Sequence, residues 1–168
     1  IHKKDLLEGA KEIGFPLITK HNRSGKGLGV HRFESLSGLE NHLKSEKFED
    51  SPDGITLLQE YIKAPSNTIT RMEFIGGKFL YAVEVDTTQG FELCPADDCQ
   101  IESNRPTTDP PKFKILTNFS LPNMEDYESF LAMNSIEVAG IEIITDSNNV
   151  VWTYDVNTNT NYNAEAEH

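Results

Sequence analysis

Residues 138–157 read Val-Ala-Gly-Ile-Glu-Ile-Ile-Thr-Asp-Ser-Asn-Asn-Val-Val-Trp-Thr-Tyr-Asp-Val-Asn. Apolar runs at 139–144 and 150–156 flank a polar tetrapeptide at 146–149, a pattern that predicts two strands joined by a turn. Because side chains alternate along a strand, Asp155 and Asn157 share one face. A hairpin centred near Asn148 places Glu142 opposite or diagonal to Asp155, at about 5 to 8 Å.

Oxygen-bearing side chains therefore converge on one patch of the predicted hairpin, namely those of Glu142, Asp155 and Asn157. Oxygen ligands without Cys or His are typical of a magnesium site, which keeps several waters and adds substrate phosphates. A solvated polar face is the alternative. Because both strands are otherwise apolar, and buried carboxylates need partners, the pattern favours the magnesium site.

The remaining elements are short helices and strands in an order that favours the α+β class, with two sheets rather than one doubly wound sheet. Gly76-Gly77 joins two strands in a strong hairpin signal. Ser37 is predicted to cap a helix. The segment 87–122 is rich in Pro, Asp, Asn and Thr, and it has only short apolar pieces. The predicted helices cover 6–13, 37–44 and 124–134, and the predicted strands 15–20, 30–33, 55–58, 69–75 and 78–85.

Residues 20–30 form a glycine-rich, basic segment, Lys-His-Asn-Arg-Ser-Gly-Lys-Gly-Leu-Gly-Val. Glycines at alternate positions let the backbone approach a ligand and turn its N–H groups inward, which suits phosphate oxygens. Lys20, Arg23 and Lys26 add positive charge. The spacing matches neither the Walker loop nor the Rossmann fingerprint, and an ordinary hairpin loop explains these residues equally well.

The segment Leu57-Leu58-Gln59-Glu60-Tyr61-Ile62 is an apolar strand that ends in polar residues. Its backbone groups could read the edge of an adenine ring at a hinge. Taken alone, the segment is more simply a strand end.

The charge of the chain excludes two classes of partner. It carries 27 acidic and 15 basic residues, a formal net charge of −12. Such a field repels nucleic acid and anionic membranes. The sequence has no apolar stretch near the roughly 20 residues of a membrane helix, and no signal peptide pattern. Cys94 and Cys99 could form a disulfide, but one pair defines no secreted scaffold, and free thiols in a cytoplasmic protein are favoured.

Taken in order, these segments resemble the ATP-grasp superfamily, and most closely its glutamate-ligase branch, which adds amino acids to a carboxylate. The resemblance rests on the segments 14–20, 25–29, 59–62, 138–142 and 155–157, and on Arg71 before Gly76-Gly77-Lys78. It implies a small lobe over 1–57 and a large lobe over 58–168, each with a mainly antiparallel sheet, that hold ATP between them. It also implies a substrate-binding domain upstream of Ile1 and a C-terminal end beyond this sequence.

The resemblance further implies a role for each candidate residue. Lys20 contacts the α and β phosphates, and the glycine-rich segment covers them. Backbone groups of Glu60 and Ile62 bind adenine. Arg71 lies near the γ-phosphate or an acyl phosphate, and Glu142, Asp155 and Asn157 hold Mg²⁺. The nucleotide-binding residues implied in this way are Lys20, Arg23, Ser24, Gly25, Lys26, Gly27, Gln59, Glu60, Tyr61 and Ile62.

The function implied is that of an ATP- and magnesium-dependent ligase that joins a small-molecule or peptide carboxylate to an amine through an acyl phosphate. A homo-oligomer is compatible with the sequence. Two alternatives stay open. Val85-Asp86 stands where the glutamate ligases have basic residues on the acceptor side, which favours a non-catalytic nucleotide-binding regulatory module. A small-molecule kinase on the same fold would form ADP without an amide.

Overall fold

The computed structural model describes residues 2–23, 29–88 and 113–158. These residues divide into two compact units, the first ending at Ile62 and the second beginning at Lys63. The lobe boundary expected between residues 57 and 58 lies inside the last strand of the first unit.

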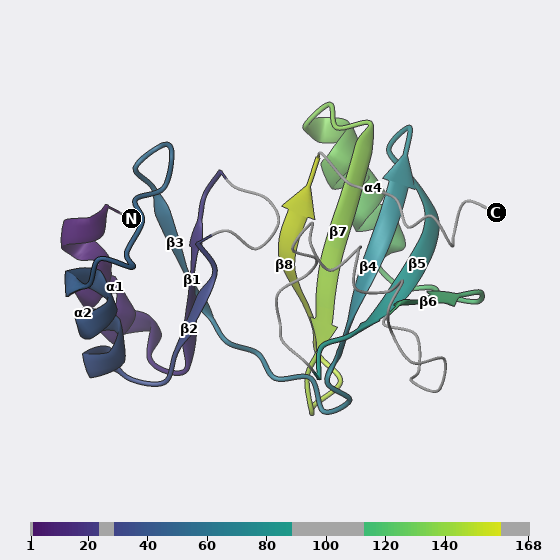
Figure 1. The fold of residues 1–168 in the computed structure, drawn as a ribbon. Coiled ribbons are helices and arrows are strands. Elements are labelled where there is room, and N and C mark those ends of the chain that lie inside the picture. The colour runs from purple at the N-terminus through teal and green to yellow at the C-terminus, as the bar shows by residue number, and fades with distance from the viewer. Residues whose placement is uncertain (1, 24–28, 89–112, 159–168) are drawn as a thin grey trace, which may run out of the picture. The chain divides into compact units, whose positions relative to one another are not determined.

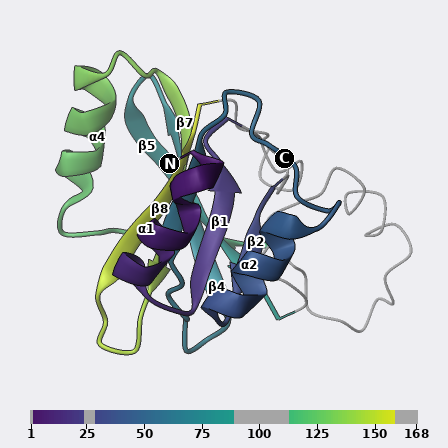
Figure 2. The same ribbon diagram turned by 90° about the vertical axis from the view of Figure 1, so that its left-hand side faces the viewer.

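The first unit packs two helices on one face of a small sheet (Figures 1 and 2). The strand order is β2-β1-β3, and both pairings are antiparallel. Its core joins helix and sheet through Ala10, Leu17, Phe33 and Leu39. The elements are the 3-10 helix η1 (Lys3–Asp5), α1 (Leu6–Ile13), β1 (Leu17–His21), β2 (His31–Phe33), α2 (Leu36–Lys44) and β3 (Thr56–Glu60).

The N-cap of helix α2 lies two residues earlier than the sequence predicted. The N-cap is Ser35, whose hydroxyl accepts the Gly38 N–H at 3.3 Å. Ser35 has extended backbone angles, as an N-cap requires, so the helix starts at Leu36. The prediction that Ser37 caps this helix was therefore wrong, because Ser37 lies within the first turn.

Alternation along β1 gives the small sheet two unlike faces. Leu17 and Thr19 are buried on the side that carries the helices. Ile18 and Lys20 must point to the other side, because successive side chains of a strand face opposite ways. This second face bears the first group of candidate functional residues.

Among its described residues, the second unit is a five-stranded antiparallel sheet with one helix on one of its faces (Figures 1 and 2). The strand order is β6-β5-β4-β7-β8. The core beneath the helix contains Met72, Phe74, Leu131 and Ile141, all fully buried. The elements are β4 (Thr68–Ile75), β5 (Lys78–Asp86), β6 (Phe113–Leu116), α4 (Met124–Met133), β7 (Val138–Thr145) and β8 (Val151–Asn157).

Strand β6 lies within 87–122, where the sequence shows only short apolar pieces. It is an edge strand whose residues pair with β5, from Ala82 opposite Leu116 to Val85 opposite Phe113. A four-residue strand shows too few alternations to give a sequence signal, and its formation depends on a partner already in the sheet.

Both units thus combine helices with an antiparallel sheet, and the expected α+β class with two sheets is confirmed. Within the described residues, no helix has both the length and the apolar character needed to cross a bilayer.

Candidate functional site

The hairpin of β7 and β8 places the two predicted carboxylates side by side. Glu142 lies opposite Asp155 in the strand register, and Gly140 lies opposite Asn157. The turn is fixed by Asp146, whose Oδ1 accepts the N–H groups of Asn148 at 2.7 Å and Val150 at 3.0 Å. The expected register near Asn148 is therefore confirmed, in its directly opposed form.

A β-bulge in this hairpin brings a tyrosine to the same carboxylate. Glu142 pairs with Asp155 but the next residue, Ile143, pairs with Thr153, so Tyr154 is the extra residue on β8. Bulges redirect side chains next to functional sites. The Tyr154 hydroxyl donates a hydrogen bond to Glu142. Burial first, and then the negative charge of Glu142, raise the pKa of Tyr154 well above its usual range, which keeps it a donor.

Arg71 and Glu73 complete this group from the neighbouring strand. Arg71 lies opposite Glu142 in the register of β4 and β7, and its Nη1 is 3.6 Å from Glu142 Oε1. Its Nε donates to Glu73 Oε1 at 2.6 Å. The exposed fractions of the three side chains are 18% for Arg71, 3% for Glu73 and 8% for Glu142. Sequence reasoning singled out Arg71 but missed Glu73, although the i, i+2 spacing on a strand puts both on one face.

These residues form two rows across the sheet, which we call the acidic patch. One row is Arg71, Glu142 and Asp155, and the other is Glu73, Gly140 and Asn157. The intervening residues Met72 and Ile141 point into the core beneath α4, so the acidic patch lies on the opposite face. Gly140 places no side chain between Glu73 and Asn157. Three carboxylates and one guanidinium meet here, which leaves a formal charge of −2.

The donor set of the acidic patch suits a hard cation. Among the described residues, no group of three or more His, Cys, Asp or Glu side chains is arranged to hold a metal. The predicted set has two carboxylates and one amide, all oxygen ligands, from two adjacent strands. Magnesium binds with one or two carboxylates when waters and substrate phosphates supply the remaining ligands. The residues present therefore fit Mg²⁺ together with a nucleotide, and fit a fully protein-bound metal poorly.

The first unit presents its own polar group on the face of the sheet away from the helices. Lys20 pairs with Leu57, and Ile18 pairs with Gln59, so Lys20 and Gln59 share this face. Arg32 also lies there, opposite Ile18, and its guanidinium stacks 3.8 Å from the centre of the Tyr61 ring.

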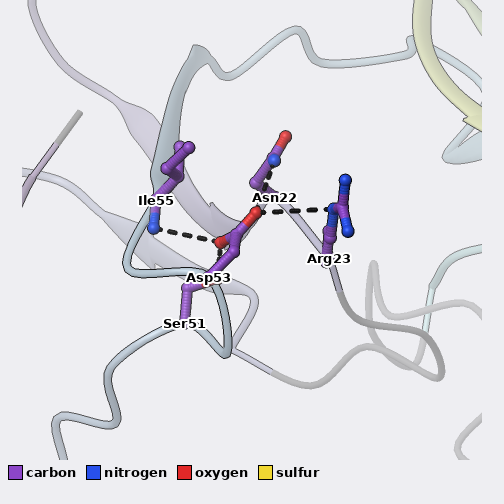
Figure 3. A network of polar contacts seen from close by, with 5 residues as sticks. All are labelled: Asn22, Arg23, Ser51, Asp53 and Ile55. Atoms are coloured by element: carbon purple, nitrogen blue, oxygen red, sulfur yellow. Dashed lines mark hydrogen bonds and ion pairs between the residues drawn. The ribbon is translucent and has the colours of Figure 1, made fainter.

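A network of polar contacts holds the start of the glycine-rich segment (Figure 3). Asp53 accepts hydrogen bonds from the Asn22 side chain at 2.7 Å, the Ser51 hydroxyl at 2.8 Å and the Ile55 N–H at 3.0 Å. The bond from Asn22, followed by that from Ser51, lowers the pKa of Asp53 to about 2. Arg23 Nε lies 3.7 Å from the same carboxylate.

Four residues of the glycine-rich segment cannot be compared with their predicted role. Ser24, Gly25, Lys26 and Gly27, predicted to cover phosphates, lie outside the described residues. The same holds for Cys94 and Cys99, predicted to be free thiols.

The end of β3 directs some of its backbone groups away from the neighbouring strand. The Tyr61 N–H donates to the Pro16 carbonyl at 3.1 Å, so the backbone of Tyr61 points toward β1. Because these directions alternate along an antiparallel strand, the N–H and C=O groups of Glu60 and Ile62 point away from β1. No described strand pairs with that side of β3, which is an edge of its sheet.

Comparisons with known proteins give a clear answer for the fold alone. No protein-family model and no curated protein matches the chain. Solved structures do. D-cycloserine synthetase DcsG matches with a TM-score of 0.61 and 12% identity, over 93% of this chain and 51% of that chain. The RimK domain protein ATP-grasp from Sphaerobacter thermophilus DSM 20745 gives 0.60 and 14%, over 94% and 50%. The ATP-grasp ligase PsnB, complexed with minimal precursor, Mg and ADP, gives 0.59 and 11%, over 95% and 43%.

The chain thus spans about half the length of these solved proteins or somewhat less. The likeness extends over more than nine-tenths of the chain and covers both antiparallel sheets. The chain therefore has the ATP-grasp fold.

Proposed function

We propose that this chain is the ATP- and magnesium-binding part of an ATP-dependent ligase that joins a carboxylate to an amine. The observation that carries the proposal is the acidic patch. Glu142 and Asp155 face each other on adjacent strands, Asn157 follows on the same face, and Arg71 reaches Glu142 from the other side. Such a concentration of buried charge is costly to maintain, and a metal–nucleotide site explains it.

Within this proposal, Glu142, Asp155 and Asn157 would hold Mg²⁺, which neutralises phosphate charge when bound. Arg71 supplies a fixed positive charge beside them. A guanidinium is well suited to phosphoryl oxygens because it presents several donors in one plane.

The first unit would bind the rest of the nucleotide. Lys20 stands on the open face of the small sheet and would contact the α and β phosphates. The outward backbone groups of Glu60 and Ile62 would read the adenine edge. Asp53 holds Asn22 and Arg23 at the start of the segment that would cover the phosphates. The first unit would thus bind the nucleotide, and the second unit would bind the metal.

The reaction would run in two steps, a phosphoryl transfer and then an acyl transfer. A carboxylate oxygen of the substrate attacks the γ-phosphorus, the bond to ADP breaks, and an acyl phosphate forms. An amine nitrogen then attacks the acyl carbon, phosphate leaves with the bonding pair, and the nitrogen loses a proton. Little covalent chemistry is required of the protein, whose residues position the reactants and offset charge.

The similar structures support a ligase and a peptide as one carboxylate source. PsnB was solved with its precursor peptide, and an ATP-grasp ligase from Chryseobacterium gregarium with ADP and a leader and core peptide. At 10–12% identity these matches show a shared fold. The nature of the carboxylate and amine substrates of this chain is therefore part of the proposal.

One observation favours a second candidate, a nucleotide-binding module without catalysis. The acceptor side has Asp86 at the end of β5 in place of a basic residue. Asp86 is engaged in its own turn, where it accepts the Thr88 N–H at 2.8 Å and the Thr88 hydroxyl at 3.0 Å.

A trapping experiment separates these candidates. The protein is incubated with ATP, Mg²⁺ and mixed amino-acid or peptide carboxylates, with hydroxylamine as the amine. A ligase working through an acyl phosphate yields hydroxamate and ADP in equal amounts. ADP without hydroxamate would identify a kinase and contradict the ligase, and bound ATP without ADP would identify the non-catalytic module.

A further inference from the structure

We propose that Glu73 is a positioning residue that holds the Arg71 guanidinium in its place within the acidic patch while Glu142 is engaged elsewhere. The inference deepens the proposed function and rests on it for the role of Arg71. Glu73 has no role in the sequence prediction, and its side chain is the most deeply buried of the three charged side chains of Arg71, Glu73 and Glu142.

The two acids do not hold Arg71 equally. Glu73 Oε1 accepts the Nε–H of Arg71 at 2.6 Å, a short charge-assisted hydrogen bond. Glu142 Oε1 lies 3.6 Å from Nη1, which is an ion pair but too long for a hydrogen bond. Glu73 is therefore the anchor, and the contact with Glu142 is the one that can be exchanged.

The anchor contacts one edge of the guanidinium. A bond through Nε fixes the inner edge of the group, because Nε is the nitrogen nearest the backbone. At the outer edge, Nη1 lies on the side of Glu142. When Glu142 turns to a cation, Glu73 would keep Arg71 in place, with the outer edge of its guanidinium directed toward phosphoryl oxygens.

The burial of Glu73 argues against an incidental ion pair. Exposed pairs contribute little to stability, and side chains in them move freely. A carboxylate that is 3% exposed is retained only with a charged or hydrogen-bonding partner. Glu84 offers a contrast on the other face of the same sheet, because it is 36% exposed and pairs with Lys114 at 3.5 Å.

The test is a double-mutant cycle with Glu73→Gln and Arg71→Gln, with ATP affinity measured by calorimetry at saturating Mg²⁺. Glu73→Gln keeps the size of the side chain and removes its charge. We expect it to weaken ATP binding about tenfold in the native background and less than twofold when Arg71 is already Gln. Glu84→Gln, the matched control, should change ATP affinity less than twofold.

A positioning role would be overturned if Glu73→Gln weakened ATP binding equally in both backgrounds, or in neither. A second readout needs no nucleotide. The Arg71 Nε–H should give a slowly exchanging NMR signal, unlike that of Arg23, whose side chain is 81% exposed. This signal should be lost in Glu73→Gln and kept in Glu84→Gln.

The two readouts distinguish the inference from the proposed function. A protected Arg71 signal in a protein that binds no ATP would sink the proposed function and leave the anchor standing. Normal ATP binding with an unprotected Arg71 signal would sink the anchor alone.

Discussion

Gly29 is required by two features of its surroundings, its backbone angle and the His21 ring. Its φ is +72°, in the left-handed region, and a Cβ placed there would overlap the ring atoms of His21. That ring is held, because His21 Nε2 lies 3.1 Å from the Glu49 carbonyl oxygen. We expect Gly29→Ala to lower the free energy of unfolding by about 1–2 kcal/mol from the backbone alone, and by more if the ring is displaced.

Denaturant unfolding checks this expectation, with Gly38→Ala as the control. Gly38 lies in α2, where an added Cβ would meet no side chain beyond its chain neighbours closer than the Ser35 hydroxyl at 3.5 Å, and its φ is not positive. Alanine should be neutral or stabilising there, by up to about 1 kcal/mol. Equal effects of the two substitutions would show that Gly29 is not constrained as described.

The Asp53 network should make stability depend on pH in a defined window. Hydrogen bonds lower the pKa of Asp53 from 3.8 to about 2. A carboxyl whose folded pKa is depressed stabilises the fold above its unfolded pKa and loses that contribution as pH falls through the folded value. The stabilisation is therefore complete above pH 4 to 5 and declines between pH 4 and 2.

Urea unfolding of the native protein and of Asp53→Asn at pH 5 and at pH 2.5 measures this contribution. The native protein should be more stable than Asp53→Asn at pH 5, and the difference should shrink at pH 2.5. A difference that does not change with pH would mean that the Asp53 carboxylate charge is not what the network stabilises.

Single site residues could be predicted from the sequence where strand alternation places them, and not elsewhere. The pairing of Glu142 with Asp155 follows from strand alternation and one turn, both visible in the sequence. Tyr154 was not foreseen because its approach to Glu142 depends on a bulge, which shifts the register within an otherwise regular hairpin. Glu73 was passed over because one more acid in an acidic chain has no distinguishing pattern.

At the scale of elements, the end of β3 offers a direct test of the hinge. The Tyr61 N–H donates to the Pro16 carbonyl, whereas the alternation of an extended chain directs the Ile62 N–H away from β1. Ile62→Pro removes an outward donor, so the fold should survive while ATP affinity falls. Tyr61→Pro removes a hydrogen bond within the sheet, so it should lower the melting temperature.

Thermal unfolding and calorimetry with ATP, applied to both variants, read out the two effects. Unchanged ATP affinity in a folded Ile62→Pro protein would remove adenine binding from this segment. A protein with Tyr61→Pro that is as stable as the native one would show that the bond to Pro16 contributes little.

Helices and strands could likewise be predicted only where the sequence carries a strong local signal. The hairpin of β4 and β5 has a glycine pair at its turn, and its strands were predicted to within one residue at each end. Strand β6 has no such signal, since Phe113–Leu116 is short and becomes a strand only by pairing with β5. The cap of α2 was misplaced by two residues because Ser35 and Ser37 are equally good caps by residue type, and only the backbone angles distinguish them.

At the scale of the whole molecule, the acidic patch serves a magnesium–nucleotide complex in the proposed function and is costly to the protein alone. Glu73, Glu142 and Asp155 lie on one face with one guanidinium, that of Arg71, so an excess of negative charge remains and the acids repel one another when Mg²⁺ is absent. Asp155→Asn keeps the size of the side chain and removes one charge. The nucleotide-free variant should be at least as stable as the native protein, yet respond poorly to Mg²⁺ with ATP.

The most direct test is the thermal unfolding of the native protein and of Asp155→Asn in the presence of ATP, measured with and without Mg²⁺. Asp126→Asn, at an exposed position of α4, is the control. At ATP a hundredfold above its dissociation constant, the native protein and the control should gain about 2.7 kcal/mol, and only when Mg²⁺ is present. Asp155→Asn should lose most of this gain without loss of stability when free of nucleotide. An Asp155→Asn protein that is destabilised on its own but keeps the full Mg²⁺-dependent gain would contradict the account, because Asp155 would then serve the fold and not the metal.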